Sequence, residues 1–283
     1  MQDRIITKKT SLNFRGKLED INAPQIMGIL NLTPDSFYDG GANSHLELSI
    51  NNVKKMLDDG ADIIDVGAYS SRPGATHISE QEEMDRLLPT LIDIHRQFPD
   101  TKISVDTFRS KVAKEAVNAG AVIINDISGG DLDSEMWATA AKLKVPYIGM
   151  HMQGNPQNMQ KKPTYTNVVD DVILALSQKI EQIKKAGIVD IIIDPGFGFG
   201  KTLDQNYEML KHLHEFQFLG HPLLVGVSRK SMIYQLLQTD ANHALNGTTA
   251  IHIIALEKGA QFLRVHDVKE AREAITIWNK VKF

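Results

Sequence analysis

Short apolar runs alternate with longer amphipathic segments along most of the chain, and two kinds of residue mark where the runs begin. Four runs follow a glycine that closes a helical segment, because glycine readily adopts the positive φ found just past a helix end. These runs are 61–66, 121–124, 188–193 and 260–265. The other four follow a proline, which a strand tolerates at its start because no ladder N–H is lost there. They are 25–30, 102–105, 147–150 and 223–227.

The alternation predicts an α/β fold with a parallel sheet, because apolar strands separated by helices must be buried on both faces. Eight strand–helix units favour a closed (β/α)8 TIM barrel over an open doubly wound sheet. Residues 10–17 alternate polar and apolar positions and predict a short hairpin that closes the barrel floor. We therefore expect one domain over residues 1–283, with an N-terminal extension at 1–24 and the barrel at 25–283.

The clearest predicted helix covers residues 168–186, where apolar residues recur on one face and two lysines occupy the last turn. Thr166 is its expected N-cap. Two capping boxes, in which a polar residue and an acid three positions later cap the same helix, are expected at Ser79 with Glu82 and at Asp267 with Glu270.

The loops that follow the strands are longer than those that precede them. Three are notably long, at 31–44, 67–78 and 151–165, whereas the helix-to-strand turns are about as short as a Gly-Ala pair. Barrel enzymes place their active sites on the strand-to-helix loops. The sequence therefore locates the active site at the C-terminal face of the barrel.

Composition narrows the classes of function. With 42% hydrophobic and 23% charged residues and a net charge of -4, the chain has no bias toward nucleic-acid or membrane binding. It contains no cysteine, which excludes disulfides, thiolate metal sites and cysteine nucleophiles. Residues 1–20 lack the apolar core of a signal peptide, and no stretch reaches the roughly 18 apolar residues of a membrane helix. We expect a cytoplasmic enzyme.

Polar residues follow nearly every predicted strand, where a strand would not select them. They are Asn31, Ser70, Ser71, Arg72, Asp106, Asn125, Asp126, His151, Asp194, Ser228, Arg229, Lys230, Arg264 and His266. A helix N-cap is the simpler interpretation of any one of them, and we prefer it for Asp126 and Ser110. Asp106, Asn125 and Asp194 form a set that should point into the barrel mouth.

These side chains divide into two chemical groups. One group can donate hydrogen bonds to an anion with several oxygens, and Asn31 offers a neutral oxygen to a metal such as Mg²⁺. The donors, which predict a diphosphate site, are Ser71, Arg72, Ser228, Arg229, Arg264 and His266. The other group offers carboxylate acceptors, an amide and a cation to a guanine-like heterocycle. Its members are Asp106, Asn125, Asp194 and Lys230.

Two further motifs do not support the function that they first suggest. Residues 196–202 resemble a phosphate-binding Walker loop, but Pro195 stands where its first glycine is required. The segment remains a glycine-rich loop in which Phe199 is a candidate pocket wall. His212 and His214 are two positions apart on an expected helix, so we interpret them as surface residues that do not share a zinc site.

At the level of motifs, the chain from 27 to 268 resembles the dihydropteroate synthase family. The matching blocks are 27–37 (MGILNLTPDSF), 71–74 (SRPG), 104–107 (SVDT), 125–130 (NDISGG), 150–151 (MH), 194–201 (DPGFGFGK), 228–231 (SRKS) and 264–267 (RVHD). The resemblance implies a (β/α)8 barrel, usually a homodimer, that uses Mg²⁺ and small-molecule substrates. The implied reaction joins 6-hydroxymethyl-7,8-dihydropterin diphosphate to 4-aminobenzoate and releases diphosphate.

The resemblance also implies a role for individual residues. The implied pterin ligands and pocket walls are Asp106, Asn125, Ile127, Met150, Asp194, Phe199, Gly226 and Lys230. The residues implied around the aminobenzoate and diphosphate are Phe37, Ser71, Arg72, Pro73, Ser228, Lys230, Arg264 and His266. The residues with an implied catalytic role are Asp106, Lys230, Arg264 and His266. Asn31 is the implied magnesium ligand.

Two departures from the family pattern fall in the second long loop, and they affect the fit of aminobenzoate or sulfonamides. Tyr69 stands where the family commonly has glutamate, and Ser71 replaces threonine. Three other functions remain as alternatives: a methyltransferase between methyltetrahydrofolate and a corrinoid, a lyase that forms a Schiff base at Lys230, and a non-catalytic pterin-binding paralogue. The diphosphate donors argue against the methyltransferase.

Overall fold

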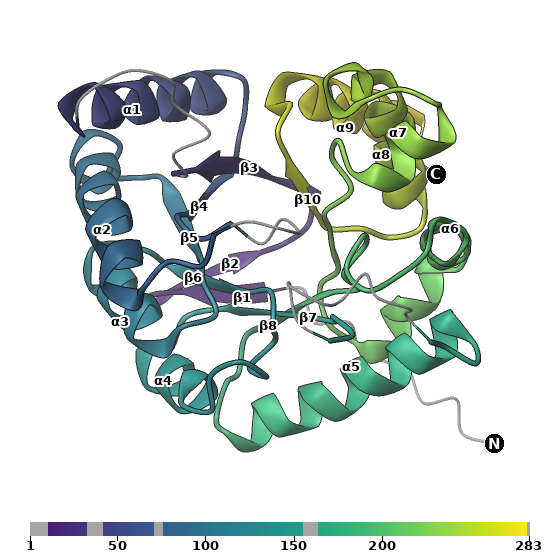
Figure 1. The fold of residues 1–283 in the computed structure, drawn as a ribbon, viewed down its shortest axis with the longest axis horizontal. Coiled ribbons are helices and arrows are strands. Elements are labelled where there is room, and N and C mark those ends of the chain that lie inside the picture. The colour runs from purple at the N-terminus through teal and green to yellow at the C-terminus, as the bar shows by residue number, and fades with distance from the viewer. Residues whose placement is uncertain (1–10, 33–41, 71–75, 155–163, 282–283) are drawn as a thin grey trace.

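The computed structural model describes residues 11–32, 42–70, 76–154 and 164–281. Within these residues eight parallel strands form a barrel, in the order β8-β7-β6-β5-β4-β3-β10-β9 (Figure 1). A bridge between Ile193 and Leu223 joins β8 to the segment entering β9 and closes the ring. The predicted (β/α)8 barrel is confirmed. Its strands are β3 (Gln25–Asn31), β4 (Ile63–Gly67), β5 (Lys102–Asp106), β6 (Ile123–Asp126), β7 (Tyr147–Met150), β8 (Ile191–Asp194), β9 (Leu224–Val225) and β10 (Phe262–Val265).

Helices connect consecutive strands and cover the outside of the barrel (Figure 1). The α-helices are α1 (Ala42–Asp58), α2 (Glu80–Gln97), α3 (Ser110–Asn118), α4 (Met136–Leu143), α5 (Val168–Lys185), α6 (Leu203–Lys211), α7 (Ser231–Leu236), α8 (Leu245–Glu257) and α9 (Val268–Val281). Two 3-10 helices are η2 (Leu213–Leu219) and η3 (Ala241–His243). No helix in the described ranges combines the length and apolar character needed to cross a membrane.

Four glycines end helices in one recurring geometry, at Gly60, Gly120, Gly187 and Gly259. Each has a positive φ, between 92° and 118°. At the first of them, the N–H of Gly60 donates to Leu57 and that of Ala61 donates to Met56, which is the double bond of a Schellman motif. Because these bonds occupy the residues after the glycine, the strands that follow begin two or three positions later than predicted.

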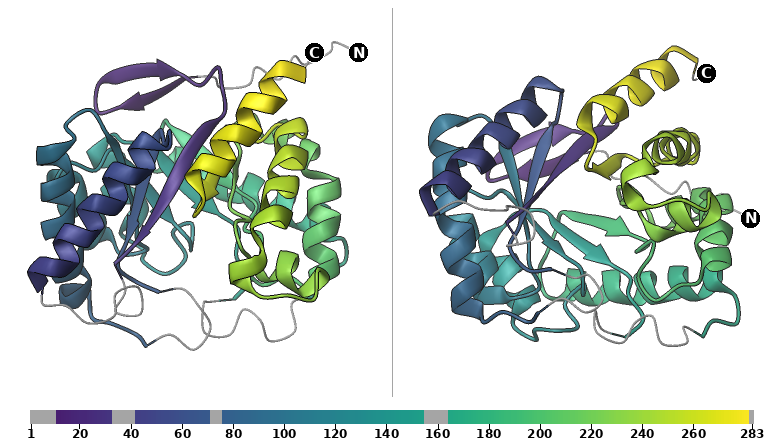
Figure 2. Two further views of the ribbon diagram at one scale, coloured as in Figure 1. Left: turned by 90° about the horizontal axis from the view of Figure 1, so that it is seen from above. Right: turned by 45° about the horizontal axis from the view of Figure 1, so that its top comes forward.

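A two-stranded hairpin closes one end of the barrel, as predicted, although it extends beyond residue 17. It consists of β1 (Ser11–Phe14) and β2 (Lys17–Asp20), which pair antiparallel around a turn in which Arg15 and Gly16 both have positive φ. Leu12 and Phe14 are buried against the inward-pointing residues at the strand starts, such as Met27. The hairpin covers the floor of the barrel in Figure 2, so the opposite rim is where the loops and functional side chains meet.

The predicted helix caps are only partly correct. Ser79 caps α2 by accepting the N–H of Glu82 at 3.1 Å. The cap of α5 is Asn167 instead of Thr166, because the Asn167 amide oxygen accepts two N–H groups of the first turn. At the start of α9, both carboxylate oxygens of Asp267 accept hydrogen bonds from Arg229.

Candidate active site

The predicted polar residues gather at the rim of the barrel opposite the hairpin. Asn31, Asp106 and Asp194 are the last residues of β3, β5 and β8. Because all eight strands are parallel, their carboxyl ends meet at this rim. Four predicted site residues lie outside the described residues: Phe37, Ser71, Arg72 and Pro73.

Arg264 of β10 is central to a cluster of buried polar groups. Its Nε donates to Oδ2 of Asp65 at 2.6 Å, and its Nη2 donates to Oδ2 of Asp106 at 2.6 Å. The same oxygen of Asp65 accepts the amide Nδ2 of Asn125 at 3.0 Å. One arginine therefore connects two carboxylates, and one carboxylate connects the arginine to the predicted pterin-binding amide.

Asp106 has an unusual ionisation state for an aspartate. Burial raises the pKa of its carboxyl to about 7; Arg264 opposes this shift, and the negative charges of Asp65, Glu83 and Asp126 add to it. A carboxyl with this pKa changes charge near neutral pH. Asp106 is thus able to supply negative charge to a bound ligand above this pH and much less below it.

A second group of contacts surrounds Asp194 and Lys230. Burial raises the pKa of the Asp194 carboxyl and lowers the pKa of the Lys230 ammonium to about 8. Lys230 donates to the carbonyl of Phe197 at 2.5 Å, and its Nζ lies 4.7 Å from the ring centroid of Phe199. The N–H of Gly196 donates to Oδ1 of Asp194 at 2.7 Å. The glycine-rich loop thus brings an acceptor, a cation and an aromatic face together.

Gly226 lies beside both Asp194 and Lys230. A Cβ placed there would lie 3.9 Å from both Asp194 Oδ2 and Lys230 Nζ. Ile127 and Met150, the other predicted pocket walls, are buried at the ends of β6 and β7. The structure therefore places the predicted pterin ligands and walls around one region of the rim.

Ser228 and His266 form a pair beside this region. Ser228 is buried, and its Oγ lies 3.1 Å from both the backbone N–H and the ring Nδ1 of His266. His266 is exposed. The pair presents a hydroxyl and an imidazole near Arg264, and these three residues are half of the six donors that the sequence predicts for a diphosphate.

Asn31 lines a groove of about 620 Å³ between α1 and α9. His266 also lines this groove, at the rim of the barrel. In the described part of the chain, no three histidine, aspartate or glutamate side chains group as a metal site. A single neutral amide suits Mg²⁺, which keeps several waters and is usually held together with substrate phosphates. The residues present therefore fit a Mg²⁺ that arrives with a diphosphate.

Three sequence interpretations need correction. Arg229 was assigned to the anion donors, but its guanidinium binds Asp267 at 2.8 Å and two backbone carbonyls near η3. Asp126 supports a turn, not a helix, by accepting from Ser128 and the backbone N–H of Gly130. Ser110 is the first residue of α3 rather than its cap.

His212 and His214 differ partly from expectation. α6 ends at Lys211, and the 3-10 turn that follows stacks the two imidazole rings with centroids 6.3 Å apart. His212 is half-buried and contacts Glu208 and Glu215, while His214 is exposed. The rings do come together, although no metal site with three such ligands exists among the described residues.

Sequence reasoning missed two buried polar residues that contact the predicted site, Asp65 and Lys201. Asp65 is an acid inside an otherwise apolar strand, and that mismatch was the available signal. Lys201 donates to the carbonyls of Gly196 and Phe199 and lies 3.1 Å from Nδ1 of His151. It therefore fixes the loop that carries Phe199, and burial lowers its pKa to about 7.

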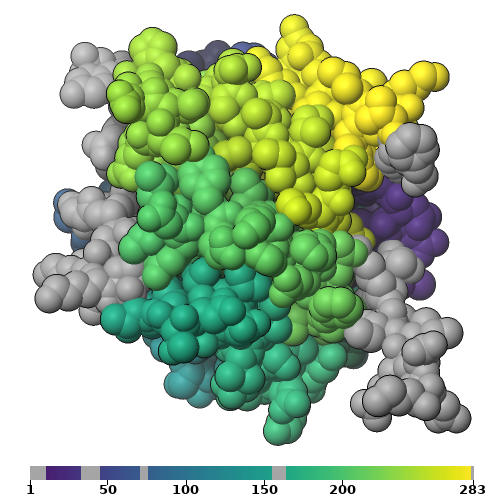
Figure 3. All heavy atoms as spheres, turned by 90° about the vertical axis from the view of Figure 1, so that its right-hand side faces the viewer, coloured from purple at the N-terminus to yellow at the C-terminus, as the bar shows by residue number. Residues whose placement is uncertain are grey.

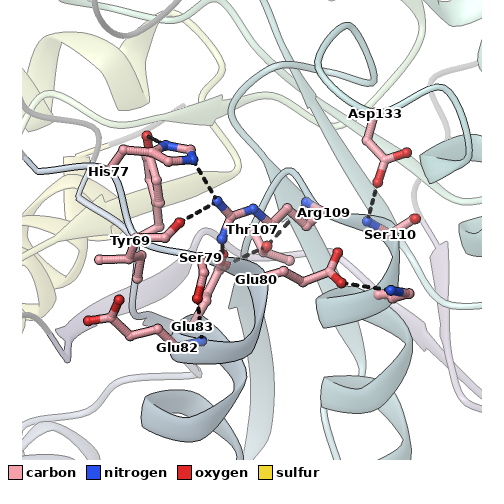
Figure 4. A network of polar contacts seen from close by, with 12 residues as sticks. Tyr69, His77, Ser79, Glu80, Glu82, Glu83, Thr107, Arg109, Ser110 and Asp133 are labelled. Carbon is pink, nitrogen blue, oxygen red and sulfur yellow. Dashed lines mark hydrogen bonds and ion pairs between the residues drawn. The ribbon is translucent and has the colours of Figure 1, made fainter.

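A further network, shown in Figure 4, connects the end of β5 to the second long loop. Arg109 donates to the buried Glu83 and to the carbonyl of Ile78, each at 2.6 Å. Its guanidinium lies over the ring of Tyr69, with 5.4 Å to the centroid, and the Tyr69 hydroxyl lies 3.2 Å from Nδ1 of His77. The tyrosine that departs from the family pattern is thus packed within a polar network next to the Asp106 strand.

The sequence of this chain is similar to a known family of enzymes along most of its length. Residues 27–266 match the model of the pterin binding enzyme family. The dihydropteroate synthase of Haemophilus influenzae is 44% identical over 269 residues, which cover 94% of this chain and 97% of that protein.

Solved structures give the same result. The dihydropteroate synthase of Xanthomonas albilineans with 4-aminobenzoic acid has a TM-score of 0.90 and 37% identity, covering 97% of this chain and 98% of that one. A sulfonamide complex of the Yersinia pestis dihydropteroate synthase also has a TM-score of 0.90, with 44% identity and coverage of 95% and 98%. The similarity therefore extends over almost the full length of each protein compared.

Proposed function

The chain belongs to the dihydropteroate synthase family of pterin-binding enzymes, and from this premise we propose how its residues carry out the reaction. The enzyme is a transferase that condenses 6-hydroxymethyl-7,8-dihydropterin diphosphate with 4-aminobenzoate to give 7,8-dihydropteroate and diphosphate. The observation that carries the assignment of residues is the Arg264 cluster, in which a cation contacts Asp106 and lies, with Asp194 and Lys230, around Gly226.

The pterin is held by the Asp194 side of the rim. The carboxylate of Asp194 accepts the exocyclic amine and ring N–H of the heterocycle, and Lys230 donates to its carbonyl. Asn125 both donates and accepts at the ring edge. Phe199, whose ring lies against the Lys230 ammonium, and Gly226, which lies beside Asp194 and Lys230, line the faces of the planar ring in this proposal, and Ile127 and Met150 supply apolar contacts.

Bond cleavage begins at the pterin methylene. The bond from this carbon to the diphosphate oxygen breaks, its electron pair leaves with diphosphate, and a cation conjugated to the pterin ring remains. Arg264, His266 and Ser228 stabilise the departing charge as hydrogen-bond donors. Asn31 would help to hold a Mg²⁺, which would neutralise further charge on the diphosphate oxygens. The carboxylate of Asp106 stabilises the methylene cation.

The second step forms the new bond. The amine nitrogen of 4-aminobenzoate attacks the methylene carbon, a C–N bond forms, and the nitrogen loses one proton to the released diphosphate or to solvent water. An arylamine is nucleophilic without prior deprotonation, so the site needs no strong base, and its residues supply position and electrostatic stabilisation. Lys230 makes hydrogen-bond and cation–π contacts within the pterin region, which supports a binding role rather than a Schiff base.

The central test is the reaction itself. Purified protein with the pterin diphosphate, 4-aminobenzoate and Mg²⁺ is expected to form dihydropteroate and diphosphate in equal amounts, measured by chromatography and a diphosphate assay. A chelator should stop the reaction and added Mg²⁺ restore it. Absence of product would contradict the synthase, and activity that survives chelation would contradict the magnesium role.

The reaction should depend on the ionisation of Asp106. Because the pKa of this carboxyl is about 7 and its charged form stabilises the cation, kcat/KM for the pterin diphosphate is expected to fall about tenfold per pH unit below that value. Burial is the main cause of this raised pKa; Arg264 lowers the pKa, and the charges of Asp65, Glu83 and Asp126 raise it further. A profile of kcat/KM against pH at saturating 4-aminobenzoate measures this decrease, which forms the acid limb of the profile. A flat profile down to pH 5 would contradict the proposed role of Asp106.

We also propose that the enzyme is a homodimer and that the helices α7, α8 and α9 form the interface. The three helices lie on the side of the molecule drawn in Figure 3, and each of them exposes at least one large apolar side chain. An exposed apolar surface of this kind is typical of an association site. The exposed residues are Leu236, Leu237, Ile254, Ile277 and Val281.

Replacing Ile254, which is 41% exposed, by glutamate is expected to convert the dimer to a monomer, because two charges would be buried across a symmetric contact. Sedimentation velocity measures the mass. Leu174→Glu on α5 is the matched control, because Leu174 is also an exposed branched aliphatic residue but lies on another face. A wild-type monomer, or equal effects of the two variants, would contradict the proposed interface.

A further inference from the structure

Asp65 is a buried acid to which the proposed mechanism assigns no task. It lies in the middle of β4 between Ile64 and Val66, and its side chain is 0% exposed. A carboxylate in such a position is costly unless other groups bind it. Its Oδ2 accepts from both Arg264 and Asn125, whereas its Oδ1 is buried with no hydrogen-bond partner among the described residues.

The two residues bound by Asp65 belong to different parts of the mechanism. Arg264 is proposed to take up the diphosphate charge, and Asn125 is proposed to bind the pterin. Asp65, Asn125 and Arg264 come from β4, β6 and β10, which are alternate strands of the barrel. Side chains from alternate strands form layers inside such barrels. Asp65 therefore lies in a position from which its Oδ2 contacts both Arg264 and Asn125 across the barrel interior.

The contact with Arg264 fixes a direction as well as a position. A guanidinium is planar and its donors form a rigid fork. Because Nε is held by Asp65 at 2.6 Å, the orientation of the plane that carries Nη1 and Nη2 is determined. Nη2 then meets Asp106, also at 2.6 Å.

We propose that Asp65 is a positioning residue of the synthase, which fixes the guanidinium of Arg264 against the leaving diphosphate and the amide of Asn125 against the pterin. This inference rests on the proposed function of these two residues. A purely stabilising ion pair explains these contacts less well, because apolar residues of similar volume often replace buried ion pairs without loss of stability. In addition, one oxygen of Asp65 has no hydrogen-bond partner among the described residues.

The charge of Asp65 also affects the pKa of Asp106, and therefore the pH dependence of the reaction, which a purely structural residue would not change. Of the acidic neighbours that raise the pKa of Asp106, Asp65 contributes most, ahead of Glu83 and Asp126. Removing this charge therefore lowers the pKa of Asp106. The acid limb of the pH profile must then move to lower pH, even though the variant has lost activity.

The experiment compares Asp65→Asn with Asp62→Asn in the full-length enzyme. Asp62 is a matched control, because it precedes the same strand and also pairs with an arginine at 2.6 Å, but at the floor of the barrel. We expect Asp65→Asn to lower kcat about 100-fold through misplacement of Arg264, to leave KM for 4-aminobenzoate within about threefold, and to shift the acid limb down by about half to one pH unit. Asp62→Asn should change melting temperature alone.

Turnover within about threefold of wild type together with an unmoved acid limb for Asp65→Asn would overturn the proposal. An inactive wild-type enzyme would instead overturn the proposed function, so the two failures are distinguishable. If Asp65→Asn does not fold, the pair Arg264→Gln and Asp65→Asn/Arg264→Gln replaces it, since the double variant leaves no unpaired charge from this ion pair. If Asp65 acts on kcat through Arg264 and on pterin binding through Asn125, the two variants should have similar kcat at saturating pterin diphosphate, and the double variant should bind the pterin more weakly. A further loss of about tenfold or more in kcat of the double variant would overturn the inference.

Discussion

Replacing Arg264 by alanine is expected to lower kcat about 1000-fold, because the departing diphosphate would lose a charged donor that the protein holds in place before the reaction begins. The variant also leaves Asp65 and Asp106 without their cation. Arg264 opposes the raised pKa of Asp106, so its loss should raise that pKa further and move the acid limb of the pH profile upward. Affinity for a pterin without diphosphate should fall by only about tenfold.

Steady-state kinetics over a pH range and pterin titration measure these effects. Arg272→Ala is the matched control, since Arg272 pairs with Asp62 at the opposite end of the barrel. That variant should lose stability but retain turnover. Unchanged turnover of Arg264→Ala would remove the arginine from the mechanism.

Substituting Asp194 by asparagine is expected to weaken pterin binding by about 100 to 1000-fold, because an amide cannot accept both N–H groups that the carboxylate accepts, and it carries no charge. The effect should be large because Asp194 is buried and lies beside Lys230, which would lose its nearby counter-charge. Loss of this charge should also lower the pKa of Lys230, since Asp194 raises it.

Fluorescence or calorimetric titration with a pterin measures the affinity directly. Asp190→Asn, at the other end of the same strand, is a suitable control and should bind the pterin normally. An Asp194→Asn variant with wild-type affinity would place the pterin elsewhere on the rim.

Much of the barrel was predictable from the sequence because its signals are local. A glycine with positive φ ends four helices whatever the rest of the fold does, and buried strands need apolar side chains on both faces. The same reasoning predicted Asp106, Asn125 and Asp194, because a polar residue at the end of a buried strand points to the rim. Strand starts were less accurate, since the Schellman bonds after residues such as Gly60 use positions that look like strand.

Other parts of the site depend on contacts between distant segments. Arg229 looks like an anion donor in the sequence, and only its pairing with Asp267, 38 positions away, shows a structural role. Asp65 lies 199 positions from Arg264, so no local pattern could connect them. The Tyr69 network likewise combines a strand end, a loop and Glu83 of α2.

The weakest junction of the barrel has a consequence for its dynamics. β9 has two residues, and its entry meets β8 through the single bridge from Ile193 to Leu223, so backbone amides there should exchange with solvent sooner than those of the longer ladders. Asp194 and Lys230 stand on opposite sides of this junction. A bound pterin would connect them, and by linkage it would slow exchange at the junction. The substrate would then connect two weakly paired strands of its own enzyme, and the free energy of unfolding would rise as the pterin site fills.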